Sequence, residues 1–318
     1  MNSRKKRQRI WKFPALILTA FITILIIFAG IFIFLKTQNY RIYKVDNQTE
    51  VHKMPQSSSK QTIYPTIYID GSAGNGIPSS WMIDEIQAQN LPNVKPGLKM
   101  TVNVFDKNKM TITGNIGAND KYPMINFCTG QNSNKKGTDR GDLYAAGLKV
   151  AIQYLTEHYN VPYMNMMGYS SGGTGAIYYM IDYSSDKNLP PVKKFLSVDG
   201  EYNKSINTYL DNGQDLTDVI LNGPIQKSEM YNYIEQNYKK ISPSVQMAFL
   251  ESTWLADKQT DSAVPWSDTF SIYHLFSENK NPIYMSFYSS PQSHAYALKQ
   301  EPVINYVKQY FYEGGKDE

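Results

Sequence analysis

Apolar positions divide the chain into an N-terminal segment and a longer remainder. Residues 13–35 form a run of 23 residues without a charge, rich in Ile, Leu, Phe and Ala. A helix of that length crosses the hydrocarbon core of a bilayer, so we predict a transmembrane helix over 13–35. A cleaved signal peptide is the alternative, but the run is longer than the usual apolar part of a signal peptide and no clear A-x-A cleavage site follows it.

The segment after the apolar run has too few apolar residues to pack. Residues 36–62 are polar and rich in turn-forming residues, which is typical of an extended, unpacked chain. We predict a polar stalk over 36–62 and a folded domain over 63–318.

Within the folded domain, β-branched and aromatic runs alternate with segments whose apolar residues recur at helical spacing. Such alternation indicates an α/β fold with a mostly parallel central sheet and helices on both faces. Residues from about 203 to 243 are polar and helical, which predicts an inserted helical cap. The predicted strands are 63–69, 99–105, 110–113, 124–128, 163–167, 195–199, 245–250 and 282–288, and the predicted helices are 79–90, 143–159, 171–182 and 301–311.

The positive charge of the chain is concentrated at its start. The formal net charge is +4, but six of the 32 Lys and Arg residues lie within residues 1–12, which contain no acid. The rest of the chain has 26 basic and 28 acidic side chains, a net charge of −2. A nucleic-acid-binding protein needs a basic face to release counterions, so that class is excluded. The basic cluster instead favours a cytoplasmic tail over 1–12 and an extracytoplasmic domain, by the positive-inside rule.

The sequence Gly168-Tyr169-Ser170-Ser171-Gly172 matches G-x-S-x-G and lies between an apolar strand and the start of a helix. In that setting a sharp turn carries the serine hydroxyl above the edge of the sheet, and small flanking residues let the turn form without clashes. We therefore predict Ser170 as a nucleophile. The alternative is a serine that only caps the following helix.

A serine hydroxyl attacks a carbonyl carbon only with the help of an imidazole base, which a carboxylate holds in place. Only two histidines, His274 and His294, follow Ser170 in the chain. His294 is favoured because it lies in a loop after the last strand, where catalytic groups are commonly found, whereas His274 lies inside a predicted helix.

Three aspartates are candidates for the carboxylate. Asp257 and Asp261 lie in the loop after the strand over 245–250, and Asp199 ends the strand before the cap. Asp261 ranks first because residues 262–265 form a turn and a helix start that would fix its direction. Asp257 ranks second and Asp199 third.

An oxyanion formed during acyl transfer needs two N–H donors in place. Ser171 would supply one from the start of the nucleophile helix, and Ser72 or Ala73 the other from the glycine-rich loop over 70–76. This loop is not a nucleotide site, because it lacks both the G-x-x-x-x-G-K-[ST] lysine and the G-x-G-x-x-G spacing.

Four stretches, at residues 68–72, 165–173, 261–265 and 293–294, occur in one order along the chain. Together they resemble the α/β-hydrolase superfamily and, more closely, an uncharacterised bacterial family of presumed cell-surface hydrolases, over roughly residues 64–311. The resemblance implies the α/β-hydrolase fold, Ser170, Asp261 and His294 as a catalytic triad, and the backbone N–H groups of Ser72 and Ser171 as oxyanion donors.

The chain departs from this family at two positions. Asp70 replaces a histidine that family members generally carry before the oxyanion-loop glycine, and Tyr169 stands where a histidine is often found. A carboxylate at residue 70 would be expected either to raise the pKa of the catalytic histidine or to disfavour an anionic transition state.

These observations predict a membrane-anchored, extracytoplasmic serine hydrolase that cleaves a carboxylic ester through an acyl-enzyme. Its partners would be an acyl ester substrate and, through residues 13–35, the lipid bilayer; the chemistry requires neither a metal nor an organic cofactor. Two other functions stay open. One is a surface protein that binds a ligand without catalysis, which Asp70 favours, and the other is acyl transfer to an acceptor in the cell envelope.

Overall fold

The computed structural model describes residues 60–72, 75–130, 140–203, 214–254 and 259–313. The chain divides into two units, Met1–Ser57 and Ser58–Glu318, and every described residue lies in the second. The predicted transmembrane helix and almost all of the predicted stalk therefore lie outside the described residues. Among the helices that the structure describes, none combines the length and the apolar character needed to cross a membrane.

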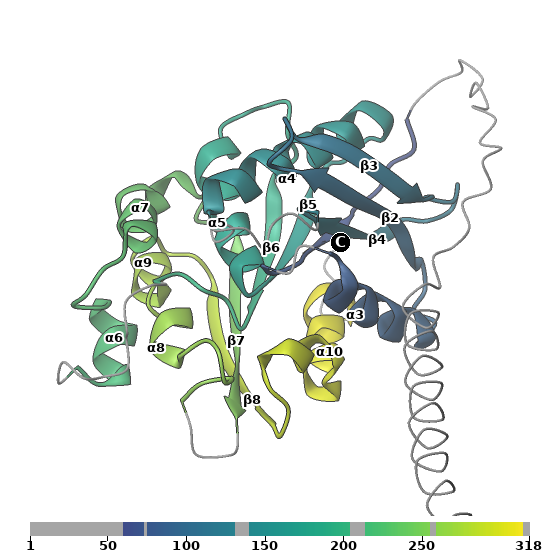
Figure 1. Ribbon diagram of the computed structural model, residues 1–318. Coiled ribbons are helices and arrows are strands. Elements are labelled where there is room, and N and C mark those ends of the chain that lie inside the picture. The colour runs from purple at the N-terminus through teal and green to yellow at the C-terminus, as the bar shows by residue number, and fades with distance from the viewer. Residues whose placement is uncertain (1–59, 73–74, 131–139, 204–213, 255–258, 314–318) are drawn as a thin grey trace, which may run out of the picture. The chain divides into compact units, whose positions relative to one another are not determined.

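The centre of the second unit is an eight-stranded sheet with the order β3-β2-β4-β1-β5-β6-β7-β8 (Figure 1). All neighbouring strands are parallel except β2 and β3, which form the predicted antiparallel hairpin. Because parallel strands end at the same edge, the residues that follow β1, β5 and β6 lie side by side there. The strands are β1 Thr66–Ile69, β2 Val94–Asn103, β3 Lys109–Gly114, β4 Tyr122–Cys128, β5 Met164–Tyr169, β6 Val192–Val198, β7 Gln246–Trp254 and β8 Ile283–Ser290.

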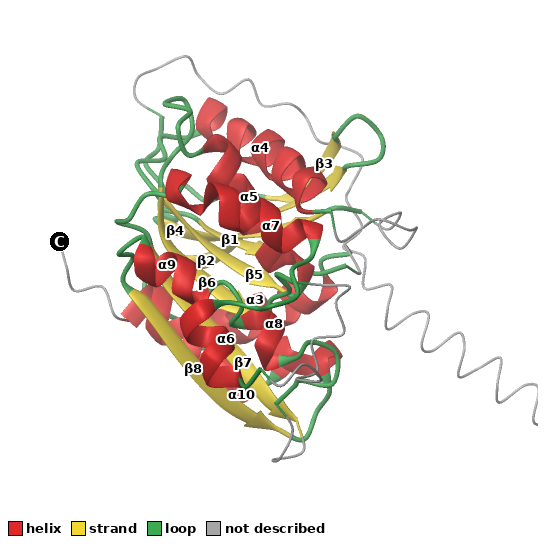
Figure 2. Cartoon of the chain, turned by 90° about the vertical axis from the view of Figure 1, so that its left-hand side faces the viewer, coloured by secondary structure: helices red, strands yellow, loops and turns green. Residues whose placement is uncertain are grey.

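Helices cover both faces of the sheet, as the strand-helix alternation predicts (Figure 2). One face packs against helices α4, α5, α7 and α9, and the other against α3, α10 and a short 3-10 helix, η3. Two separate clusters of buried apolar side chains fill these layers. The helices are α3 Ile77–Ala88, α4 Gly141–His158, α5 Ser171–Tyr183, α6 Leu216–Asn222, α7 Glu229–Asn237, α8 Trp266–Thr269, α9 Tyr273–Glu278 and α10 Glu301–Lys308, with 3-10 helices η2 Tyr238–Lys240 and η3 His294–Lys299 and a final π-helical turn, η4 Gln309–Glu313.

The predicted elements are present, but several of their ends differ: β1 begins at Thr66 and not at residue 63, and pairing extends β5 and β7 beyond their predicted ends. Strand β5 continues through Gly168 and Tyr169, because these residues pair in register with Ser197 and Val198 of β6. Strand β7 runs past Leu250 to its end at residue 254, because β8 pairs with it over that whole length. Tertiary pairing of this kind is not visible in the local pattern of apolar residues.

The segment predicted as a cap is helical where it is described, from residue 214 onward. Its helix α7 packs against α5, with the rings of Tyr178 and Tyr233 stacked at 4.4 Å between centroids. Tyr231 and Ile234 of α7 are fully buried in the same apolar cluster as α5. This part of the segment therefore thickens the helical layer on one face of the sheet.

Candidate active site

Ser170 lies at the sharp turn between β5 and α5, as the G-x-S-x-G pattern predicts. Its backbone has φ 54° and ψ −131°, a positive φ that is rare and strained for a residue with a side chain. The turn brings its backbone carbonyl to the N–H of Gly173, at 2.9 Å. The strained turn at this position is the geometry expected of a nucleophilic serine on this fold.

Glycines allow the backbone to come close to this turn. A Cβ atom on Gly172 would lie 2.4 Å from the carbonyl oxygen of Ile69, and one on Gly71 would lie 2.9 Å from the Cβ of Ser170. Side chains at these two positions would therefore overlap with their neighbours. As a result, the loop after β1 lies directly against Ser170, where the sequence predicts the second oxyanion donor.

His294 and Asp261 form a closely joined pair. The Nδ1 atom of His294 bonds to Oδ2 of Asp261, and the backbone N–H of His294 donates to the backbone carbonyl of Asp261 at 2.9 Å. The other carboxylate oxygen, Oδ1, accepts the N–H groups of Ala263 and Val264 at 2.7 and 2.6 Å. The turn over 261–264 thus directs the carboxylate of Asp261, the first-ranked of the three candidate acids, at the imidazole.

Tyr169 connects this pair to the nucleophile turn. Its ring stacks on the imidazole of His294 with 5.0 Å between centroids and 24° between planes, and its hydroxyl donates to the backbone carbonyl of His294 at 2.5 Å. Since Tyr169 directly precedes Ser170, the imidazole lies beside the nucleophile turn. No hydrogen bond joins Ser170 to His294 in the described part of the chain, and in free enzymes such contacts often tighten only when substrate binds.

The surroundings of His294 favour its protonated form. Burial of the ring lowers its pKa, but the hydrogen bond and the negative charge of Asp261, with smaller contributions from Asp199 and Glu201, outweigh burial and raise the pKa above its ordinary value. A raised pKa makes the imidazole a stronger base, which suits a group that must take a proton from a hydroxyl.

Asp199 is a second carboxylate near the imidazole. One ligand atom each of Asp199, Asp261 and His294 lie within 4.8 Å of one another. Asp199 is fully buried, and its oxygens accept the backbone N–H of Ser252 at 3.2 Å and the hydroxyl of Tyr288 at 2.7 Å. Burial, reinforced by the charge of Asp261, raises the pKa of Asp199 to about 8. At pH 7 Asp199 is therefore mostly protonated, and its negative charge, which contributes to the raised pKa of His294, develops as the pH rises toward 8.

The two carboxylates and the imidazole are close enough together to be considered as ligands of a metal ion. Their carboxylate oxygens, however, are already engaged: Asp261 accepts two backbone N–H groups and binds the imidazole, and Asp199 accepts an N–H and a hydroxyl. Oxygens that bind a cation keep their lone pairs directed at it. The arrangement therefore fits a hydrogen-bonded chain better than a metal centre.

Asp70, the carboxylate that the sequence places near the site, is bonded to the loop after β1 and to the start of α3. It is 1% exposed, and its two oxygens accept the N–H of Gly76 at 2.7 Å, the N–H of Ser79 at 3.2 Å and the hydroxyl of Ser79 at 2.9 Å. The carboxylate is thus turned toward the start of α3. The groups that raise the pKa of His294 are Asp261, Asp199 and Glu201.

The remaining predicted residues fall in several places. Ser171 begins α5 and is fully buried, and Ser72 is partly exposed in the loop after β1. Asp257 and Ala73 lie outside the described residues. His274, the second choice for the base, packs in α9 against Tyr231, whose hydroxyl lies 3.3 Å from its Nε2 atom.

Two tyrosines, Tyr169 and Tyr288, shape the site without a clear signal in the sequence. The sequence marked Tyr169 only as a departure from the family, although its ring and hydroxyl both hold His294. The hydroxyl of Tyr288, which bonds to Asp199, gave no signal because a tyrosine in a strand is ordinary. One signal was available: Asp199 directly follows a buried strand, as Ser170 does, which indicates that it lies at the same edge of the sheet as the other site residues.

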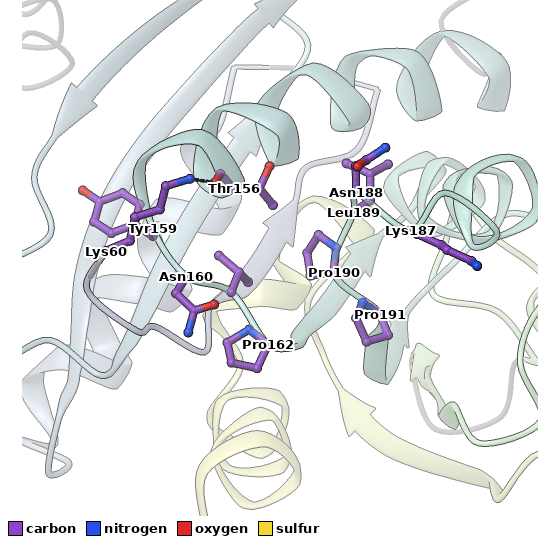
Figure 3. A pocket seen from close by; sticks show the side chains of 11 residues that line it. Lys60, Thr156, Tyr159, Asn160, Pro162, Lys187, Asn188, Leu189, Pro190 and Pro191 are labelled. Carbon is purple, nitrogen blue, oxygen red and sulfur yellow. Dashed lines mark hydrogen bonds between the residues drawn. The ribbon is translucent and has the colours of Figure 1, made fainter. Parts of the chain in front are cut away.

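A cavity of about 340 Å³ lies at the opposite edge of the sheet (Figure 3). Its lining includes Asn160 and Pro191, which precede β5 and β6. Ser170 follows the carboxyl end of β5, so the length of the strand separates this cavity from the nucleophile turn. The cavity is therefore not part of the candidate active site.

Comparisons with known proteins find solved structures with a similar fold. The crystal structure of a gene product from Listeria innocua has a TM-score of 0.68 and 24% identity, covering 80% of this chain and 96% of that one. A presumed cell surface hydrolase from Lactobacillus plantarum has a TM-score of 0.60 and 18% identity, covering 78% and 91%. At these identities the likeness shows the fold. No curated protein matches the chain.

A family model described as an alpha/beta hydrolase of unknown function (DUF915) matches residues 53–314. This match covers the whole sheet, the nucleophile turn and the Asp261–His294 pair. The chain therefore belongs to this family of α/β hydrolases.

Proposed function

We propose that the protein is a serine hydrolase that cleaves carboxylic esters through an acyl-enzyme. The observation that carries the proposal is the buried carboxylate of Asp261 on Nδ1 of His294, with the imidazole stacked beside the strained turn of Ser170. An alcohol, an imidazole and a carboxylate gathered in this order are the groups that acyl transfer requires.

In the proposed reaction the hydroxyl of Ser170 attacks the carbonyl carbon of the ester. Asp261 accepts the Nδ1–H of His294, so Nε2 is left as the basic nitrogen that takes the serine proton. His294 then returns this proton to the leaving alcohol, and water repeats the sequence to release the acid. The backbone N–H groups of Ser72 and Ser171 would stabilise the negative oxygen of both tetrahedral intermediates.

The proposed location is the outer face of a membrane, with residues 13–35 as a single uncleaved anchor and residues 1–12 in the cytoplasm. The apolar run and the basic residues before it support this proposal. The name of the similar Lactobacillus plantarum protein, which places it at the cell surface, points in the same direction.

The alternative function, ligand binding without catalysis, has less support from the structure than from the sequence alone. The feature that favoured it was Asp70, and the carboxylate of this residue is occupied by Gly76 and Ser79. Acyl transfer to an acceptor other than water uses the same acyl-enzyme, so added alcohols or amines would distinguish it by the products that form.

Turnover of p-nitrophenyl esters of several chain lengths tests the proposal. Ser170→Ala should lower kcat/KM by at least about 10³-fold, because it removes the nucleophile. Ser171→Ala is a matched control, since it keeps the backbone N–H and deletes a buried hydroxyl that finds no hydrogen-bond partner among the described residues. Its turnover should stay within about threefold of wild type, because deleting an unpaired hydroxyl is nearly neutral. Ester cleavage that persists in Ser170→Ala would remove Ser170 as the nucleophile.

A further inference from the structure

The loop between β1 and α3 lies against Ser170 and is held by side chains from α4, β2 and β4 and by its own first residue, Asp70. The structure describes Gly71, Ser72, Asn75 and Gly76 of this loop. The position of the Ser72 N–H group decides whether an oxyanion beside Ser170 finds a second donor, and a donor misplaced by a fraction of an ångström loses most of its effect. The side chains that fix this loop therefore affect the stabilisation of the oxyanion.

The hydroxyl of Tyr144, on α4, donates to the backbone carbonyl of Gly71 at 2.8 Å. A peptide unit is planar and trans, so its carbonyl and the following N–H point in opposite directions. The carbonyl of Gly71 is directed at Tyr144, and the N–H of Ser72 is thereby directed away from it. Tyr144 is 2% exposed, so water does not compete for this bond.

The carboxylate of Asp70 closes the other end of the loop. It joins the last residue of the loop, Gly76, and the third residue of α3, Ser79, back to the end of β1. A negative group at this end of α3 also interacts favourably with the helix dipole. Burial raises the pKa of Asp70 to about 6, so the group is ionised at neutral pH and accepts hydrogen bonds through both oxygens.

Two further side chains hold carbonyl groups of the same loop. The Nζ atom of Lys99, on β2, donates to the carbonyl of Asn75 at 2.9 Å, and the side-chain amide of Asn126, on β4, donates to the carbonyl of Gly76 at 2.9 Å. Carbonyl oxygens that are bonded to protein donors do not face an oxyanion, which they would repel.

We propose that Asp70 and Tyr144 are positioning residues that hold the loop after β1 in the arrangement an oxyanion needs. The proposal rests on the proposed function, since it assigns these residues to the stabilisation of that function's transition state. It also explains why an aspartate is compatible with activity at residue 70: the carboxylate acts through the loop and does not contact the reacting atoms.

The experiment compares the full-length chain in detergent with Asp70→Asn and Tyr144→Phe. Asparagine at residue 70 offers one acceptor oxygen in place of two, so Gly76 or Ser79 loses its partner. Phenylalanine at residue 144 deletes one hydroxyl and keeps the ring. Both variants should lower kcat for p-nitrophenyl acetate by roughly 10- to 100-fold, with KM changed by less than about threefold, because the loop acts mainly in the transition state.

Asp120→Asn is the matched control. Asp120 also accepts a loop N–H, that of Gly117, at 2.7 Å, but it precedes β4 and so lies at the opposite edge of the sheet. Its kcat should equal that of wild type. A drop in this control as large as in Asp70→Asn would overturn the proposal, because the loss would then be a general effect of weakening a loop.

Hydrogen–deuterium exchange of the peptides that cover residues 70–80 gives a readout that does not need turnover. Asp70→Asn should exchange faster at Gly76 and Ser79 than wild type. Unchanged exchange, or faster exchange with unchanged kcat, would overturn the positioning role. If Asp70→Asn does not fold, Tyr144→Phe decides the question, and an unchanged kcat in that variant would contradict the proposal. Absence of turnover and of fluorophosphonate labelling in wild type would instead contradict the proposed function itself.

Discussion

The imidazole of His294 has two carboxylates near it, and the structure gives them different roles. One carboxylate oxygen of Asp261 bonds to the ring, and the other accepts hydrogen bonds from two backbone N–H groups. Asp199 bonds to Tyr288 and Ser252 instead. Burial, reinforced by the negative charge of Asp261, raises the pKa of Asp199.

Replacement of Asp261 by Asn tests the direct contact. The amide can still accept the N–H groups of Ala263 and Val264 through its oxygen, but it would present N–H₂ to Nδ1 of His294. That reverses the tautomer of the ring and should lower kcat/KM by roughly 10⁴-fold. A loss of less than about tenfold would show that another group orients the imidazole.

The pH dependence of activity follows from the raised pKa of His294. The base must be deprotonated, so kcat/KM should fall on the acid side with a midpoint above the ordinary histidine pKa of about 6.5. In Asp261→Asn the residual activity should show a midpoint at lower pH, because the group that raises the pKa is gone. Identical acid limbs in the two proteins would contradict this account.

Asp199→Asn tests whether the second carboxylate near His294 is needed for activity. Because the pKa of Asp199 is about 8, asparagine resembles the protonated form, and activity at pH 7 should stay within roughly tenfold of wild type.

The titration of Asp199 should also make the stability of the wild type depend on pH in a defined direction, and Asp199→Asn should remove that dependence. The folded-state pKa lies above the value of about 4 expected in the unfolded chain, so wild type gains stability below pH 4 and loses it as the pH rises to about 8. Asp199→Asn lacks this loss. Urea unfolding at pH 5, 7 and 9 should therefore show wild type weakening relative to the variant, and parallel curves would refute the assignment.

At the scale of elements, the site is built where parallel strands end. Asp70, Ser170 and Asp199 each follow a strand directly, and β1, β5 and β6 are neighbours in the sheet. Their gathering could be predicted from the sequence because strand-helix alternation indicates a parallel sheet and catalytic groups collect at the carboxyl ends of its strands.

Contacts between distant elements could not be predicted in the same way. The sequence gives no sign that the hydroxyl of Tyr144 meets Gly71, 73 residues earlier in the chain, or that Tyr169 stacks on His294. Both contacts depend on how helices and loops pack on the sheet, which local periodicity does not encode. The direction of Asp70 is missed for the same reason, since its partners lie at the start of the next helix.

Gly172→Ala tests the close packing of elements at the nucleophile turn. The added methyl group would meet the carbonyl oxygen of Ile69 at 2.4 Å, so β1 and α5 must separate. The free energy of unfolding should fall by about 1–3 kcal/mol, as for other overpacked sites, and the rate of fluorophosphonate labelling should fall with it. Wild-type values for both quantities would mean that the close approach is not required.

At the scale of the whole molecule, the chain combines an α/β-hydrolase domain with a proposed membrane anchor. The family match and the sheet establish the domain, whereas the tether is a proposal from residues 1–35. Full-length protein should stay in the membrane pellet after carbonate washing and dissolve in detergent, and a chain lacking residues 1–36 should be soluble. Release of the full-length chain by carbonate would contradict an integral anchor.

The central claim is that Ser170 is a nucleophile activated by His294 and Asp261. It is tested most directly by treating the full-length protein with a fluorophosphonate and mapping the adduct by peptide mass spectrometry. The account predicts one phosphonyl adduct, on Ser170, which is absent in Ser170→Ala and forms much more slowly in Asp261→Asn. An adduct on a different residue, or a folded wild-type chain that stays unlabelled, would contradict it.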